Sequence, residues 1–258
     1  MSKVVAIVGY KKSGKTSLIE ALLEELRGRG LRVGVIKHTT RRYPVDTPGK
    51  DTWRYMEAGA RASALLTPMD TAIFLRRTSE LDEVIHILQI LDLVLLEGFK
   101  DLDRVPRIIL AKDRSEVERL RNGLEVAVTG KIAKSNIGEL GVPIIDPGAV
   151  GALAEIVENK AIPLLPGLNC SKCGYPSCKE LARAVVAGKA KVLNCVNLPS
   201  RDVHILLDGR PLRINPFVGR ILRNVVMGVL STLKGVETPE TVEVKFLSDK
   251  KAPKGKQF

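Results

Sequence analysis

Apolar residues follow two different periods along the first part of the chain. Short continuous apolar runs, such as residues 4–8 and 93–96, have the length and composition of buried β-strands. Between such runs the apolar residues recur three or four positions apart, as in residues 19–26, which is the period of a helix with one buried face. Alternating strands and helices indicate right-handed crossovers and a mainly parallel sheet covered on both faces. The pattern therefore predicts a doubly wound α/β domain over residues 1–160.

The expected elements of this domain succeed one another without a long interruption. Strands are expected at residues 4–8, 31–37, 62–66, 72–76, 93–96, 107–111, 125–129 and 142–145, and helices at 17–29, 81–88, 113–121 and 149–158. Ligands of doubly wound domains bind outside the carboxyl ends of the strands, so the residues that follow these strands are the first candidates for a site.

Beyond residue 160 the pattern changes. Residues 161–169 hold two prolines and a glycine and are expected to be an extended linker. All four cysteines then fall within residues 170–200, which we expect to form a small module of its own.

The last part of the chain is expected to be a small α+β unit over residues 201–248, followed by a basic tail at 249–258. The unit would contain strands at 203–207, 211–214 and 241–246, a turn at 208–209 and a helix at 216–234. The helix carries an apolar stripe that we expect to be core or a subunit interface, formed by Val218, Ile221, Leu222, Val225, Val226, Val229 and Leu233.

Composition supports a globular protein without a membrane segment. The 258 residues are 45% hydrophobic and 27% charged, which is ordinary for a soluble chain. No apolar run reaches membrane-spanning length. Because the first residues enter a core strand at once, we expect no signal peptide and a cytoplasmic location.

The net charge of +12 is unevenly distributed. From Cys170 to the end there are 16 lysines and arginines against 7 aspartates and glutamates, so this part carries most of the excess. Such a basic region could attract nucleic acid, an acidic protein surface or an anionic cofactor, or it could be a solvated surface. Nucleic acid is the less expected partner, because aromatic residues that stack on bases make up only 4% of the chain.

A complete P-loop, Gly-x-x-x-x-Gly-Lys-Thr, occupies residues 9–16 between an expected strand and an expected helix. In this setting the backbone N–H groups of the loop wrap a phosphate at the positive end of the helix. Lys15 would reach the β- and γ-phosphates, and the Thr16 hydroxyl would bind Mg²⁺. The sequence therefore predicts a site for a nucleoside triphosphate, with candidate residues Gly9, Lys12, Ser13, Gly14, Lys15, Thr16 and Ser17.

Other polar residues follow neighbouring strands. Glu97 ends an apolar strand, where P-loop proteins place the acidic group that holds Mg²⁺, and we expect it to be catalytic together with Lys15; a solvent-exposed strand end is the alternative. Lys37 and His38 leave the second strand at the same expected edge, although a single histidine is often structural. Asp51 is a further candidate, whose spacing from Arg54 also fits a purely structural pair.

Taken together, these segments resemble the molybdopterin-guanine dinucleotide biosynthesis protein B family. The resemblance covers about residues 1–150 and rests on the P-loop with Ser17 and Leu18, the Val-Ile-Lys-His sequence at 35–38, residues 46–52, Arg54, the Ala-Gly-Ala sequence at 58–60 and the Leu-Leu-Glu-Gly-Phe-Lys sequence at 95–100.

The resemblance implies a GTP- and Mg²⁺-binding protein that hydrolyses GTP slowly at most. Its partner would be the guanylyltransferase that attaches GMP to molybdopterin. Family members usually carry more histidines after the Lys-His pair, where this chain has Thr39, Thr40, Arg41 and Arg42, and two arginines could still serve a pterin phosphate. GTP rather than ATP rests on the resemblance alone, because the guanine-reading Asn-Lys-x-Asp sequence is absent and the loop at 130–136 lacks a decisive acceptor.

Cysteines stand at positions 170, 173, 178 and 195. Three clustered thiolates with a distant fourth are typical of iron–sulfur ligation, whereas zinc sites more often show two close pairs. The segment also resembles the small four-cysteine 4Fe–4S domain of several anaerobic electron-transfer proteins. We therefore expect Cys170, Cys173, Cys178 and Cys195 to bind a 4Fe–4S cluster, with zinc, disulfides or free thiols as alternatives.

Three functions compete at this point. The first is a GTP-binding accessory protein for guanylylation of the molybdenum or tungsten cofactor, and a homodimer is compatible with it. The second is a nucleotide-driven redox or metallocentre-maturation protein whose hydrolysis gates the cluster. The third is a basic docking or nucleic-acid-binding module with a structural cluster.

Overall fold

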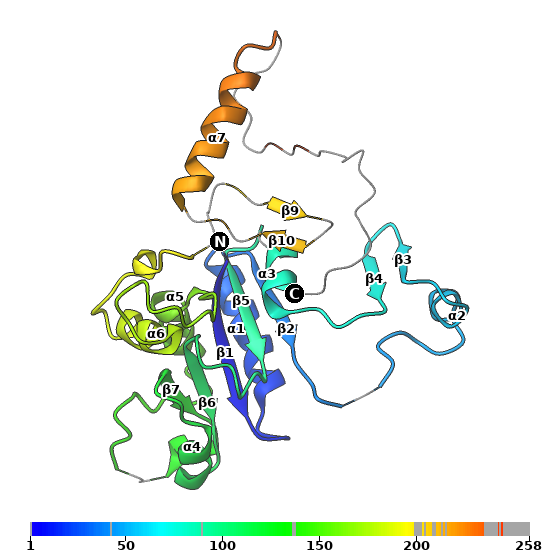
Figure 1. Cartoon of the computed structure of the whole chain (residues 1–258). Coiled ribbons are helices and arrows are strands. Elements are labelled where there is room, and N and C mark those ends of the chain that lie inside the picture. Colours follow the sequence, from blue (N-terminus) through cyan, green and yellow to red (C-terminus); the bar gives the residue numbers. More distant parts are fainter. Residues whose placement is uncertain are drawn as a thin grey trace.

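The computed structural model of the chain describes most of its first 198 residues and parts of the remainder (Figure 1). The described residues are 2–41, 43–88, 90–135, 138–198, 203, 205–207, 210–212, 214, 216–234, 242 and 244. Arg42 and Asn136, the expected turn at 208–209 and the tail at 249–258 lie outside them, as do most residues of the expected strand at 241–246.

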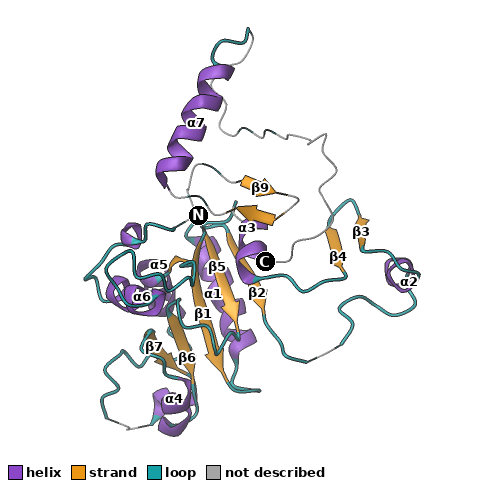
Figure 2. Cartoon of the chain, viewed as in Figure 1, coloured by secondary structure: helices purple, strands orange, loops and turns teal. Residues whose placement is uncertain are grey.

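A mainly parallel sheet with the strand order β2-β5-β1-β6-β7 forms the centre of the protein (Figure 2). These strands are β1 (Lys3–Gly9), β2 (Val33–Lys37), β5 (Leu93–Glu97), β6 (Arg107–Leu110) and β7 (Glu125–Thr129), and each pairs in parallel with its neighbours. The first strand of the chain lies in the middle of the sheet, so the connections run outward in both directions from it. The predicted doubly wound α/β fold is confirmed.

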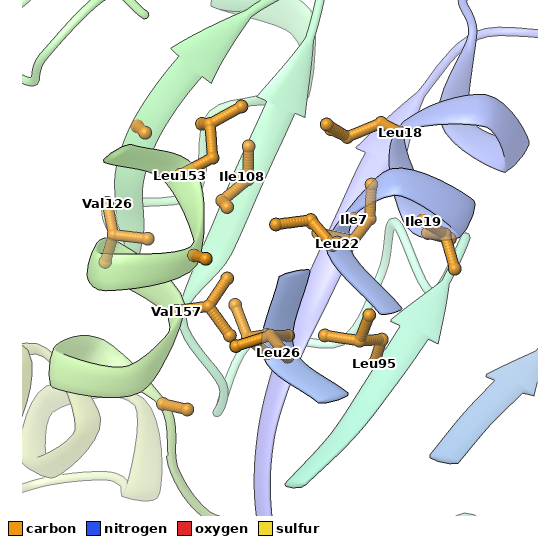
Figure 3. Packing of buried hydrophobic residues seen from close by; sticks show 14 of the residues in the cluster. Ile7, Leu18, Ile19, Leu22, Leu26, Leu95, Ile108, Val126, Leu153 and Val157 are labelled. Atoms are coloured by element: carbon orange, nitrogen blue, oxygen red, sulfur yellow. The ribbon is translucent and has the colours of Figure 1, made fainter. Parts of the chain in front are cut away.

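Successive residues of the central strand serve opposite faces of the sheet. Val5 and Ile7 pack under helices α1 (Lys15–Gly28) and α5 (Val150–Lys160), where Leu22 and Leu153 are fully buried (Figure 3). The alternate residues of the strand form a second cluster on the opposite face. That cluster includes Val4, Ala6 and Val8 of the strand, Val117 and Leu120 of helix α4 (Arg114–Leu120), and Leu81 and Ile85 of helix α3 (Leu81–Ile87) at its margin.

Two expected strands lie outside the central sheet. β3 (Ala62–Leu66) and β4 (Thr71–Leu75) pair with each other as an antiparallel hairpin, and helix α2 (Asp51–Glu57) precedes them. The hairpin and α2 stand away from the central sheet (Figure 1). The connection between the two strands is too short for a parallel crossover, which explains why they form a hairpin.

Two further expectations differ from the structure. Residues 142–145 form no strand, because the pairing with β7 is limited to the bridge between Val128 and Ile144. Residues 161–169 are extended, but their first part is not an exposed linker. Ile162–Pro163 forms β8, which pairs antiparallel with the start of β1. Leu165 is fully buried in an apolar cluster with Leu124 and Cys178, so this stretch packs between the first unit and the cysteine segment.

The cysteine segment contains helix α6 (Cys178–Val186), and the residues after it include strands β9 (Ile205–Leu207) and β10 (Arg210–Leu212) and helix α7 (Pro216–Leu230). The two strands pair antiparallel, as expected for a hairpin. The expected burial of the α7 stripe is wrong for the single chain, since Ile221, Val225 and Val229 are exposed. The subunit-interface alternative for this stripe stays a prediction. Within the described part of the chain, every helix is too short or too polar to cross a membrane.

Replacement of Leu22 by alanine tests the packing of α1 against the sheet. Leu22 is fully buried, so Leu22→Ala should lower the free energy of unfolding by about 2–5 kcal/mol, from lost apolar contact and the cavity left behind. Leu66→Ala is the matched control, because Leu66 is 75% exposed and its loss should cost about 0.5 kcal/mol or less. Urea unfolding followed by circular dichroism measures both, and equal losses would contradict the assigned core.

Candidate functional site

The P-loop connects the end of β1 to the start of α1, at the carboxyl edge of the sheet. A Cβ atom on Gly9 would lie 2.6 Å from Ser13 Oγ and 2.7 Å from the backbone oxygen of Leu110, so only glycine allows this close passage. Lys12 and Gly14 have left-handed backbones, with φ of 62° and 93°. A turn of this kind directs successive N–H groups into one concavity, which suits an anion.

Lys15 folds back over the loop that precedes it. Its Nζ atom donates to the Tyr10 carbonyl oxygen at 2.7 Å and lies 3.4 Å from Ser13 Oγ. Burial lowers the pKa of Lys15; Glu97 opposes this shift, while Lys100 and Lys37 add to it. The electrostatic surroundings of the loop are therefore dominated by positive charge, with one carboxylate among them. Thr16 and Ser17 are exposed on the first turn of α1.

Glu97 and Lys37 are opposite each other on neighbouring strands. The register pairs Glu97 of β5 with Ile7 of β1 on one side and with Lys37 of β2 on the other. Lys37 Nζ lies 3.0 Å from Glu97 Oε1. The Glu97 side chain is only 11% exposed and that of Lys37 is 58% exposed, so the carboxylate is held inside and the ammonium group reaches out. The exposed-strand-end alternative for Glu97 is wrong.

His38 is fixed by the turn that follows β5. Its backbone N–H donates to the Glu97 carbonyl oxygen at 3.0 Å, and its ring lies 5.0 Å from the ring of Phe99, measured between centroids. A Cβ atom on Gly98 would meet the His38 carbonyl oxygen at 3.1 Å, so the two loops touch here. The structure thus brings His38 to the same edge as Lys37 and Glu97.

Asp51 is not brought to this edge. It begins α2, which stands apart from the P-loop (Figure 1), and its carboxylate lies 3.7 Å from Arg54 on an exposed surface. The structural pairing of Asp51 with Arg54 is present, and a nucleotide contact for Asp51 stays a prediction.

Three further residues lie at this edge, namely Tyr10, Lys100 and Arg119. The sequence did not single them out as site residues. Lys100 Nζ lies 4.2 Å from the centroid of the Tyr10 ring, and the guanidinium carbon of Arg119 lies 5.5 Å from it. Arg119 Nε also donates to the Tyr10 hydroxyl at 3.2 Å. Lys100 could have been found from its place three residues after Glu97. No sequence signal points to Arg119, which comes from α4.

The four cysteines lie near one another beside the first unit. Cys178 and Cys195 are buried in a cluster that also contains Leu124, Ile162 and Leu165, while Cys170 is exposed. Burial raises the pKa of the Cys195 thiol; a backbone hydrogen bond with Asn197 opposes this shift, and the charges of the other three cysteines add to it. The N–H of Lys172 and the Asn197 side chain lower the pKa of Cys170.

Hydrogen bonds with two asparagine side chains fix cysteines in this segment. Asn197 Nδ2 donates to Cys170 Sγ at 3.0 Å, and Asn169 Oδ1 accepts from the Cys178 N–H at 2.9 Å. Among the described residues, no three His, Cys, Asp or Glu side chains converge closely enough to hold one metal ion.

The two candidate sites lie at opposite edges of the sheet. Ile162 pairs with Val4 at the start of β1, and the P-loop begins at the other end of that strand. Arg183 of α6 donates to the carbonyl oxygen of Asn122, in the loop before β7, at 2.7 Å. The cysteine segment is therefore joined to the amino-terminal edge, away from Lys15 and Glu97.

The chain has a P-loop between β1 and α1 and an acidic residue, Glu97, at the end of the neighbouring strand β5. These features define a P-loop nucleotide-binding protein of the α/β class. The family model "MobB: Molybdopterin guanine dinucleotide synthesis protein B" matches residues 4–129, and the model "Putative Fe-S cluster" matches residues 165–196. A relative from Methanocaldococcus jannaschii, named "Putative molybdopterin-guanine dinucleotide biosynthesis adapter protein", is 33% identical over 95% of this chain and 97% of its own length. This chain belongs to the MobB family.

Two more comparisons cover separate parts of the chain. The crystal structure of Bacillus subtilis MobB has a TM-score of 0.53 and 29% identity, and it covers 60% of this chain and 98% of that one. A component of the ion-translocating oxidoreductase complex of Cereibacter sphaeroides is 48% identical over 44 residues, which are 17% of this chain and 23% of that protein. The resemblance of the first unit to the MobB family is confirmed, and the cysteine segment is similar to an iron–sulfur family.

Substitution of Glu97 by glutamine tests the predicted magnesium ligand. An amide is a poorer ligand than a carboxylate for a hard cation. In Glu97→Gln, the increase in triphosphate affinity that Mg²⁺ produces should therefore be about ten-fold smaller than in wild type. Triphosphate affinity in the presence of EDTA should change much less. Glu158→Gln on α5 is the control, since Glu158 pairs with Arg29 on the surface. Identical Mg²⁺ titrations for wild type and Glu97→Gln would leave Glu97 with only its ion pair to Lys37.

Proposed function

We propose that the protein binds GTP with Mg²⁺ and, as a member of the MobB family, assists the guanylyltransferase that attaches GMP to molybdopterin. The observation that carries this proposal is the placement of Lys15, Glu97 and Lys37 together at the carboxyl edge of the sheet, next to an intact P-loop. Membership of a family whose relatives are named adapter proteins supports the role in cofactor biosynthesis.

Each residue at the edge has a distinct part in nucleotide binding. The backbone of Gly9, Lys12, Ser13, Gly14 and Ser17 surrounds the phosphates, and Lys15 exchanges its bonds to Tyr10 and Ser13 for phosphate oxygens. Thr16 and Glu97 would hold Mg²⁺, which would neutralise charge on the phosphates. Lys37 positions the Glu97 carboxylate through their ion pair, and the His38 N–H is held by the Glu97 carbonyl oxygen. The protein is a slow GTPase at most, in keeping with an adapter.

Cys170, Cys173, Cys178 and Cys195 would hold a 4Fe–4S cluster. The cluster would supply a one-electron redox centre and would tie together a segment that is short for a core of its own. The amide groups of Asn197 and Asn169 and the start of α6 would orient the cysteines around it. We therefore divide the chain into a nucleotide unit at 1–160, a connection at 161–169, a cluster module at 170–200, a small α+β unit at 201–248 and a tail at 249–258.

The opposite placement of the two sites favours the adapter over the maturation alternative. A cluster that gates nucleotide turnover directly would face the phosphates, whereas α6 is attached near Asn122 and β8 at the amino-terminal edge. The cluster can then stabilise the fold of its segment or contact a partner without touching the nucleotide. The basic character of the module, which has Lys172, Lys189 and Lys191 on its surface, suits an acidic protein partner.

Calorimetric titration with GTP and ATP, each with Mg²⁺, tests the nucleotide. GTP should bind at least about ten-fold more tightly than ATP, and Lys15→Ala should abolish binding of both while the fold remains intact.

Co-precipitation with purified molybdopterin guanylyltransferase tests the partner. Equal affinity for GTP and ATP together with no co-precipitation would contradict the accessory role. It would favour the alternative of a nucleotide-driven maturation protein.

Anaerobic purification with metal analysis tests the cluster. We expect about four irons per chain and broad absorption near ~400 nm, both lost or degraded in each single Cys→Ala variant. Because the nucleotide site lies at the other edge of the sheet, Cys178→Ala should keep its GTP affinity. One zinc and no iron would reject the iron–sulfur assignment, and loss of GTP binding on cluster loss would show that the two sites are coupled.

A further inference from the structure

Lys100 is delivered to the P-loop by an unusual turn. Immediately after Glu97, both Gly98 and Phe99 have left-handed backbones, with φ of 95° and 48°. This conformation is rare for a residue with a side chain and is retained where the surrounding structure enforces it. The turn directs the next residue back across the loop after β1, so that Lys100 Nζ lies over the ring of Tyr10 at 4.2 Å.

A buried arginine fixes the backbone of the same turn. Arg107 is 1% exposed, and its guanidinium group donates to the carbonyl oxygen of Lys100 at 3.0 Å, to that of Leu120 at 2.9 Å and to that of Leu102. Its Nε atom has no hydrogen-bond partner among the described residues. A buried cation that binds carbonyl groups rather than a carboxylate is costly, and its effect here is to hold the main chain around Lys100.

The side chain of Lys100, in contrast, is exposed and placed among like charges. Its charge lowers the pKa of Lys15, as does that of Lys37, so the cations at the edge repel one another. Lys37 has the Glu97 carboxylate at 3.0 Å, whereas Lys100 lies over an aromatic ring, a weaker partner for an ammonium group. A polyphosphate at the P-loop would relieve this repulsion.

We propose that Lys100 is a further triphosphate-binding residue, which moves from the Tyr10 ring to the terminal phosphate while Arg107 holds its backbone. This inference rests on the proposed nucleotide binding. The loop N–H groups would serve diphosphate and triphosphate alike. Lys100 adds a contact that only the triphosphate offers. It therefore makes the site bind a nucleoside triphosphate in preference to a diphosphate.

Calorimetry with guanosine 5′-(β,γ-imido)triphosphate and with GDP, both with Mg²⁺, tests the proposal on the full chain. Lys100→Met removes the charge but keeps the aliphatic stem over Tyr10. It should weaken triphosphate binding by about ten-fold, the value of one charge-assisted contact, and GDP binding by less than about two-fold. Lys100→Arg, which keeps the cation, should recover most of the loss.

Lys3→Met is the matched control. Lys3 begins β1 at the edge opposite the P-loop and is exposed, so the variant makes the same change in net charge far from the phosphates. Its affinities should equal those of wild type. Equal losses for triphosphate and GDP in Lys100→Met, or no loss for either, would overturn the role of Lys100. If wild type binds neither nucleotide, the proposed function fails together with this inference.

Discussion

Burial of the central strand is the constraint on which the remaining structure depends. β1 is covered on both faces and paired along both edges, with β5 on one side and β6 and β8 on the other. A strand in this position cannot shift its register without exposing a whole row of apolar side chains. Its two ends are therefore fixed points, one of which starts the P-loop while the other receives the chain that leads to the cysteines.

Positive charge at the carboxyl edge is the second determinant of function. Lys15, Lys37 and Lys100 gather around one buried carboxylate, Glu97. Three positive charges around one carboxylate repel one another. A bound anion with several charges would offset this repulsion. The ion pair between Lys37 and Glu97, together with the left-handed turn at Gly98, fixes the positions of these groups at the edge.

The cysteine segment packs directly against the first unit of the chain. Leu124, Ile162 and Leu165 form one apolar cluster with Cys178, Leu181 and Leu198, and Arg183 adds a hydrogen bond to Asn122. Because this contact lies at the amino-terminal edge, the module leaves the nucleotide edge accessible. A chain built in this way presents two separate surfaces, one at the P-loop and one at the cysteine segment.

The sequence by itself determined the P-loop, the parallel sheet and the likeness to the MobB family, because local spacing and hydrophobic period carry that information. It also placed Glu97, Lys37 and His38 at strand ends that meet at one edge. Tertiary structure alone decided that residues 62–75 form a separate hairpin, that Ile162 and Leu165 are buried, and that Asp51 lies away from the P-loop. It alone brought Lys100 and Arg119 to Tyr10. The physical reason is that these contacts join residues far apart in the chain, whose meeting depends on which elements pack together and not on local pattern.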